Sequence, residues 1–176
     1  LTHLSLNKNT ISAIESDSFK YLVSLTVLFL SDNCLFHIDS SIFSNLKTLE
    51  ALHLSRNVIR KISNYAFKDL ILLKTLNLDD NKINNFDQNV FDSLKKLKTL
   101  NLTKNLIQNL NASIFDNLAQ SLSNLYINNV EFNLEAKVIK LPNLLALDLL
   151  ISSKAILKML DFNSMMILKY LELSSY

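Results

Sequence analysis

Leucine recurs along this chain at a fixed interval of 24 residues. Within each interval, further leucines follow three and five positions later and asparagine follows eight positions later, which gives the motif LxxLxLxxNxI. We number positions from the first leucine of each repeat, so that this asparagine stands at +8. The first five repeats begin at Leu1, Leu25, Leu49, Leu73 and Leu97. A period of this length predicts a stack of similar units, each of which buries its apolar side chains against its neighbours.

The repeats that follow are less regular. A sixth begins at Leu122 and places Val130 where asparagine stands earlier, a seventh begins at Leu144, and a partial eighth begins at Leu168. All of them retain the spaced leucines or other large apolar residues. We therefore predict a single domain over residues 1–176, with repeats starting at 1, 25, 49, 73, 97, 122 and 144 and a partial repeat at 168.

Each repeat is predicted to contain a short strand, because the leucines at +3 and +5 point to the same side of an extended chain. Stacked in parallel, such strands form a sheet whose inner side is a continuous leucine core. A phenylalanine column at +18 is expected to line the opposite side of that core, and no helical period connects the two sides. The fold class is an α/β solenoid, curved into an arc, with short turns or 3-10 segments outside the sheet. The asparagine amides are expected to bond turn backbone in a ladder of Asn9, Asn33, Asn57, Asn81 and Asn105.

Composition and charge exclude several functional classes. The net charge of +2 with 19% charged residues does not indicate a nucleic-acid partner, and no run of about 18 apolar residues predicts a membrane span. His3, His37 and His53 share no ligand spacing with cysteine or carboxylates, so no metal or other cofactor is expected. No nucleophile stands beside a base, and the chain contains no glycine for a phosphate loop. We therefore do not expect an enzyme.

The motif, its 24-residue period and the phenylalanine at +18 resemble the leucine-rich-repeat family, in the animal extracellular subclass of Toll-like receptors, slit-like proteins and neuronal adhesion molecules. The resemblance implies a right-handed horseshoe with the parallel sheet on its concave face. It also implies an extracellular or cell-surface recognition module of a receptor or adhesion protein that binds a protein ligand or co-receptor, with glycan or lipid as further ligand classes. The alternative is an intracellular scaffold or regulatory subunit. Neither of the cysteine-rich caps of extracellular members is present, so we expect a fragment whose membrane attachment, if any, lies outside this chain.

Candidate contact residues lie at the outward strand positions +2, +4, +6 and +7. The +4 column brings Phe29, His53, Asn77, Tyr126 and Asp148 to the middle of the sheet, where exposed aromatic side chains are good anchors for a partner. Single exposed aromatics are also common on proteins without a partner there. In the seventh repeat the segment LLALDLLI is predicted to form an apolar patch, which marks an interface or is covered by chain outside this segment. That patch is predicted to include Leu145, Leu150 and Tyr170.

Two further features have competing interpretations. The +7 column alternates in sign through Lys8, Asp32, Arg56, Asp80 and Lys104, which predicts either a self-satisfied ladder of ion pairs or a ligand-reading row. Cys34 follows a ladder asparagine and is expected to be a small buried apolar residue.

Asn101 and Asn111 each begin an N-glycosylation sequon, with Thr103 and Ser113 at the third position. A glycan on Asn111 is expected to be tolerated outside the strands. A glycan on Asn101 would cover the middle of the sheet.

Overall fold

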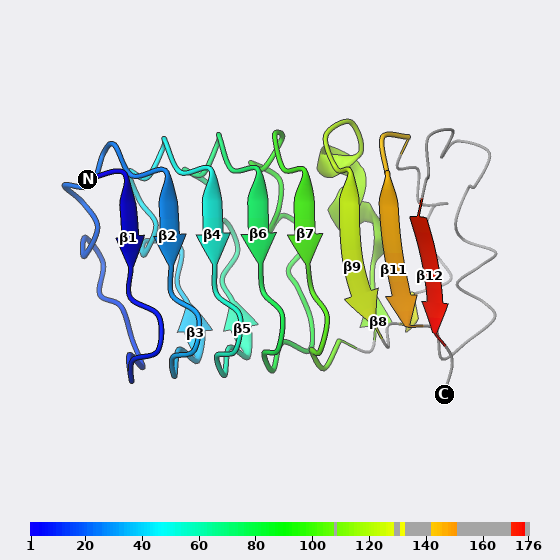
Figure 1. The fold of residues 1–176 in the computed structure, drawn as a ribbon, viewed down its shortest axis with the longest axis horizontal. Coiled ribbons are helices and arrows are strands. Elements are labelled where there is room, and N and C mark those ends of the chain that lie inside the picture. Colours follow the sequence, from blue (N-terminus) through cyan, green and yellow to red (C-terminus); the bar gives the residue numbers. More distant parts are fainter. Residues whose placement is uncertain (108, 129–130, 133–141, 151–169, 175–176) are drawn as a thin grey trace.

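One wall of the molecule is a sheet of parallel strands (Figure 1). The computed structural model describes residues 1–107, 109–128, 131–132, 142–150 and 170–174. Within this part of the chain the large sheet has the order β1-β2-β4-β6-β7-β9-β11-β12. Its strands are β1 (His3–Ser5), β2 (Val27–Phe29), β4 (Ala51–His53), β6 (Thr75–Asn77), β7 (Thr99–Asn101), β9 (Asn124–Asn128), β11 (Ala146–Leu150) and β12 (Tyr170–Ser174). Each strand comes from one repeat, as the leucine spacing predicted.

The register of the sheet places equivalent repeat positions side by side. Leu28 of β2 pairs with Leu4 of β1 and with Leu52 of β4, and the same +3 leucine pairing continues along the sheet. The side chains at +2 and +4 therefore form two continuous outward columns.

The opposite wall carries short elements that the sequence did not predict. β3 (His37–Ile38) pairs in parallel with β5 (Lys61–Ile62), and β8 (Asn109–Leu110) pairs with β10 (Glu131–Phe132). The 3-10 helix η1 (Ala112–Leu118) follows β8. The remaining crossovers among the described residues are turns, so the prediction of turns and 3-10 segments in place of long helices is confirmed.

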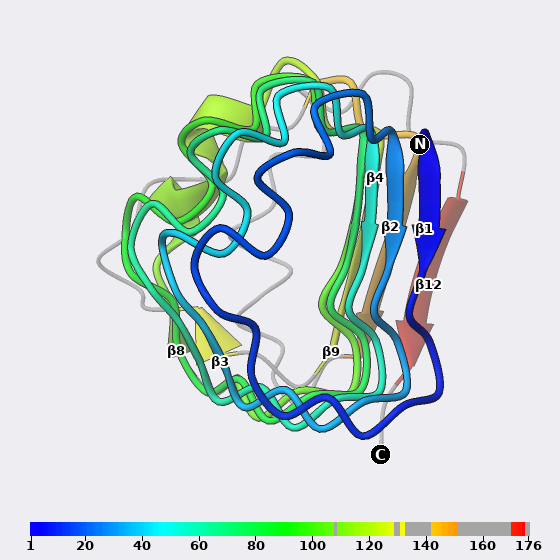
Figure 2. The same ribbon diagram turned by 90° about the vertical axis from the view of Figure 1, so that its left-hand side faces the viewer.

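Viewed along the stack, the repeats superimpose as closed coils around a shared interior (Figure 2). In this view the middle strands are set back relative to β1 and β12, so the outer surface of the sheet is concave. The predicted arc with the sheet on its concave face is therefore confirmed.

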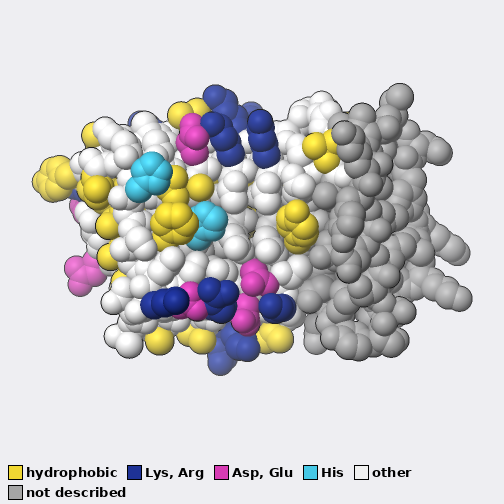
Figure 3. Space-filling model, viewed as in Figure 1, with side chains coloured by type: hydrophobic (Ala, Val, Ile, Leu, Met, Phe, Trp, Pro, Cys, Tyr) yellow, Lys and Arg dark blue, Asp and Glu magenta, His cyan; other side chains and the backbone are white. Residues whose placement is uncertain are grey.

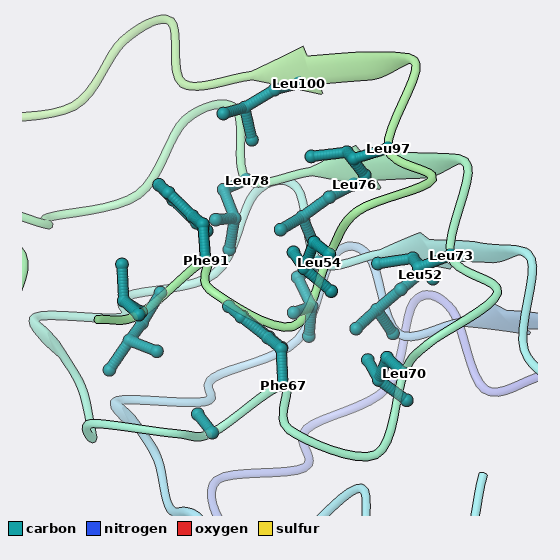
Figure 4. Packing of buried hydrophobic residues seen from close by; sticks show 14 of the residues in the cluster. Leu52, Leu54, Phe67, Leu70, Leu73, Leu76, Leu78, Phe91, Leu97 and Leu100 are labelled. Carbon is teal, nitrogen blue, oxygen red and sulfur yellow. The ribbon is translucent and has the colours of Figure 1, made fainter. Parts of the chain in front are cut away.

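Leucines from the sheet and phenylalanines from the opposite wall fill the interior (Figure 4). Phe67 is fully buried and stacks against Phe43 at 6.1 Å and against Phe91 at 6.4 Å between ring centroids. Phe19 continues the column at 6.5 Å from Phe43. The predicted phenylalanine column is confirmed, and burial of each ring contributes on the order of 2–3 kcal/mol.

The asparagines at +8 bond the backbone within and between repeats. The Nδ2 group of Asn57 donates to the carbonyls of Leu54 in its own repeat at 3.0 Å and of Leu30 in the preceding repeat at 2.9 Å. Its Oδ1 accepts from the backbone N–H of Leu35 at 3.0 Å. Asn33, Asn81 and Asn105 make the equivalent bonds to both carbonyls, whereas the side chain of Asn9 donates, among the described residues, to Leu6 and Asn7 of its own repeat.

The residue before each of these asparagines lies in the left-handed region. The φ angles at +7 are 56° for Lys8, 57° for Asp32, 51° for Arg56, 53° for Asp80 and 52° for Lys104. Glycine is the usual residue for this conformation, and the chain has none. The backbone N–H groups of the first four donate across to the next repeat at 2.9–3.0 Å, so hydrogen bonding continues through the turn and offsets part of the steric cost.

Candidate binding surface on the sheet

The outward columns at +2 and +4 form the surface that we call the sheet face (Figure 3). In the +4 column Phe29 pairs in register with His53, His53 with Asn77, and Asn77 with Asn101. Tyr126 follows in register with Asn101. The structure therefore brings four of the predicted contact residues, Phe29, His53, Asn77 and Tyr126, into one column. Among the described residues of the column, all except Ser5 are partly buried.

An aromatic pair occupies the N-terminal half of the sheet face. The rings of Phe29 and His53 are stacked, with centroids 4.8 Å apart and planes inclined by 17°. Val27 and Ala51 lie beside them in the +2 column. Such a stack contributes about 0.5–1.5 kcal/mol beyond the burial of its surface and offers a rigid apolar contact area.

Partial burial lowers the pKa of His53 below its ordinary value of 6.5, since it disfavours the charged imidazolium. In the unfolded chain the ring regains the ordinary pKa. As the pH falls through about 6.5, the unfolded chain therefore takes up a proton before the folded chain does, and stability decreases until the folded pKa is passed.

We expect His53→Phe to remove the loss of stability at low pH that is due to His53. The variant retains an aromatic ring at the position but cannot titrate. Urea unfolding of both proteins at pH 7.5 and pH 5.5 measures the change in the free energy of unfolding. Because both proteins contain His3 and His37, the difference between them reports His53. An equal loss of stability in wild type and variant would contradict the assignment to His53.

Charged side chains border the sheet face where the strands end. Arg56 donates to Asp32 from Nε to Oδ1 and, at 2.9 Å, from a terminal guanidinium nitrogen to Oδ2. Hydrogen bonding from Arg56 lowers the pKa of the Asp32 carboxyl below its ordinary value. Within the described residues no further ion pair joins two members of the +7 column. Among the described residues, the predicted ladder of ion pairs is therefore represented by one pair, Arg56 with Asp32.

A second charged border lies where the strands begin, at +1. The Nζ atom of Lys74 lies 2.8 Å from a carboxylate oxygen of Glu50, and Lys98 follows in the next repeat. Both members of the pair are nearly half exposed, so the pair contributes about 0–1 kcal/mol. The sheet face is therefore a weakly polar strip between two charged borders (Figure 3).

Asn77 and Asn101 form the centre of the sheet face. Each side-chain oxygen accepts a bond from the backbone N–H two residues later, from Asp79 at 2.9 Å and from Thr103 at 3.0 Å. Among the described residues neither Nδ2 group donates to a protein acceptor. These two amides therefore present hydrogen-bond donors that a ligand can use.

The two sequons lie in different settings. Asn101 is partly buried on the sheet face, whereas Asn111 is exposed and caps the 3-10 helix η1, with its Oδ1 accepting from the N–H of Ser113 at 3.0 Å. Attachment of a glycan at either site stays a prediction.

The register divides the predicted patch of the seventh repeat. Asp148 lies in the +4 column between Tyr126 and Glu172, whereas Tyr170 pairs with Ala146 in the +2 column. Leu145 precedes β11 at the +1 border and is exposed. The backbone of Leu150 lies at the end of β11, and the side chains of Asp148, Leu150 and Tyr170 are outside the described part of the structure.

Two predictions from the sequence are wrong. Position +6 does not face solvent in the second and third repeats, because Ser31 and Ser55 are buried and their hydroxyl oxygens lie 2.9 Å apart. The chain already turns inward there. Cys34 is exposed, because buried Asn33 and Leu35 on either side of it direct its side chain outward.

A second row of outward residues was not recognised in the sequence. Positions +9 and +11 flank the buried apolar residue at +10 and alternate with it, which is the signal that could have identified them. Position +9 carries Cys34, Val58, Lys82 and Leu106, and position +11 carries Phe36, Arg60 and Asn84. All seven side chains are exposed, and the row lies beyond the strand ends, on the edge of the solenoid.

The described part of the chain contains no group of three or more histidine, cysteine or acidic side chains placed to hold a metal ion. Nor does it contain a helix with the length and apolar character that a membrane span requires.

Comparison with known families agrees with the architecture. The family model for the leucine rich repeat matches residues 1–40, 24–83 and 71–132, and so covers three quarters of the chain. No curated protein sequence matches it.

Solved structures share the fold. A leucine-rich-repeat protein of Leptospira interrogans is 29% identical with a TM-score of 0.79, over 99% of this chain and 43% of its own. An internalin of Listeria monocytogenes is 25% identical with a TM-score of 0.73, over 98% of this chain and 47% of its own. Drosophila Toll, in its complex with Spatzle, is 25% identical with a TM-score of 0.52, over 76% of this chain and 23% of that one. The chain thus spans less than half the length of each of these structures.

Proposed function

The chain belongs to the leucine-rich-repeat family, whose domains are generally protein-interaction modules, and from that premise we propose that it is the recognition segment of an extracellular or cell-surface receptor or adhesion protein. In this proposal the concave sheet face binds a protein ligand or co-receptor. The observation that carries the proposal is the Phe29–His53 stack on an otherwise weakly polar strip between charged borders. Aromatic anchors surrounded by polar groups are typical of protein-binding surfaces.

The aromatic side chains supply the contact area and the neighbouring amides supply direction. Phe29 and Tyr126 lie at opposite ends of a stretch whose middle is Asn77 and Asn101. The Nδ2 groups of these asparagines can donate to carbonyl oxygens of a partner. A fold neighbour, Toll, forms a complex with Spatzle that is described as a molecular hub in development and innate immunity, which supports a receptor role.

One observation favours an extracellular or cell-surface location, and another favours an intracellular one. The exposed sequon at Asn111 favours a secretory protein. The exposed thiol of Cys34 favours the alternative of an intracellular scaffold or regulatory subunit, because free thiols persist in reducing compartments. Antibody against residues 1–132 separates the two possibilities, since labelling of intact cells that express the protein supports the surface role. Labelling only after permeabilisation favours the intracellular alternative.

Binding through the sheet face is tested on a panel of purified secreted and surface proteins. We expect Phe29→Glu and Tyr126→Glu each to weaken binding of a panel member at least about ten-fold, because a charge replaces an aromatic anchor that the partner would cover. Val23→Glu, which changes a side chain that is 61% exposed and lies off the sheet, is the matched control and should bind normally. Circular dichroism confirms that the variants are folded. Binding that survives both sheet-face variants would contradict the proposal.

A further inference from the structure

A hollow of about 170 Å³ opens on the edge of the solenoid, between the third, fourth and fifth repeats. Its lining is Arg60 and Asn84 at +11 together with Lys82 and Leu106 at +9. Adjacent repeats hold these residues together, because the N–H of Lys82 donates to the Ile59 carbonyl at 2.9 Å. In turn the N–H of Leu106 donates to the Ile83 carbonyl at 2.8 Å. A single water requires roughly 10–15 Å³, so the hollow has room for a side chain of a ligand.

The two cations of the hollow have no partner among the described residues. Neither the guanidinium of Arg60 nor the ammonium of Lys82 takes part in a hydrogen bond or an ion pair there. Arg56 and Lys74, in the same two repeats, are both paired with carboxylates. The hollow therefore presents two positive charges that an acidic group can satisfy.

Apolar surface adjoins these charges. Leu106 in the lining is 55% exposed, and Val58, two residues before Arg60, is 42% exposed. Phe36 is 57% exposed and accepts a backbone bond from Arg60 at 3.0 Å. Along the lower margin of Figure 3, hydrophobic side chains lie on either side of basic ones. A simple inorganic anion would leave the apolar part uncovered.

We propose that this hollow binds an acidic peptide segment of a protein partner, with a carboxylate between Arg60 and Lys82 and a neighbouring apolar side chain against Leu106 or Val58. The amide of Asn84 can both donate to and accept from a peptide backbone, which suits a polypeptide better than a lipid headgroup. The site lies beyond the strand ends and goes beyond the proposed role of the sheet face. A partner can therefore engage either surface without the other.

The test is a fluorescence-anisotropy titration of the 176-residue chain with labelled peptides that alternate aspartate or glutamate with leucine or phenylalanine. We expect salt-sensitive binding that Arg60→Gln and Lys82→Gln each weaken about five-fold and that the double variant weakens about twenty-five-fold. Lys68→Gln removes the same charge from an exposed side chain of the third repeat and should bind as wild type does. Phe29→Ala on the sheet face should also leave peptide binding unchanged.

Three further arms distinguish the ligand classes. Peptides with serine in place of the apolar residues should bind more weakly, and inorganic phosphate and phosphatidylserine vesicles should compete poorly. Phosphate that binds as tightly as the peptide, or vesicles that bind when the peptide does not, would overturn the proposal. So would peptide binding that is as tight in the double variant as in wild type, or no peptide binding at all. If Phe29→Glu loses binding to the protein panel but still binds the peptide, the hollow and the sheet face are separate binding sites.

Discussion

Replacing Asn57 with alanine is expected to destabilise the chain by about 3–5 kcal/mol. The variant leaves the buried N–H of Leu35 without the acceptor that it has among the described residues, which costs about 1–3 kcal/mol. The carbonyls of Leu30 and Leu54 each lose one donor but retain another from a neighbouring ladder asparagine, so each lost bond costs about 1 kcal/mol. Urea unfolding followed by circular dichroism measures the change in the free energy of unfolding.

Asn9→Ala is the matched control for this prediction. Asn9 occupies the same position in the first repeat, but it is exposed, and among the described residues its side chain donates to Leu6 and Asn7 of its own repeat. Its loss should cost less than about 1 kcal/mol, because water replaces an exposed bond. Equal destabilisation by the two substitutions would show that the bonds between repeats add nothing to the ladder.

Phe67→Ala is expected to cost about 3–5 kcal/mol. The ring is fully buried between Phe43 and Phe91, so its removal opens a cavity that neighbouring repeats can fill only by moving along the stack. Thermal unfolding and urea unfolding both report the loss.

The control is Phe19→Ala, at the N-terminal end of the same column. Phe19 stacks on one side only and is 5% exposed, so water and neighbouring chain fill the space more easily. We expect a smaller loss than for Phe67. A larger loss would contradict the view that stability comes from stacking on both sides of each repeat.

The sequence predicted the residues of the sheet face well but not those of the solenoid edge. Strand alternation around Leu28 and Leu52 was sufficient to place Phe29 and His53 in one outward column, since neighbouring strands repeat the same register. The same argument failed at Ser31 and Ser55, because a strand of three residues has already ended at +6. Alternation resumes around +10 beyond the left-handed turn, which is why the outward position of Cys34 was missed.

By itself the sequence determined the family, the 24-residue coil, the parallel sheet, the leucine and phenylalanine core, and the asparagines that join the repeats. These features follow from the periodicity, because every repeat has the same surroundings and buries its apolar side chains at the same positions. Only the tertiary structure decided that Arg56 pairs with Asp32 while Arg60 and Lys82 meet in an open hollow beside Leu106. Contacts of this kind, between residues of adjacent coils, depend on the direction of the side chains and on the local turn geometry. The repeat length determines neither of these.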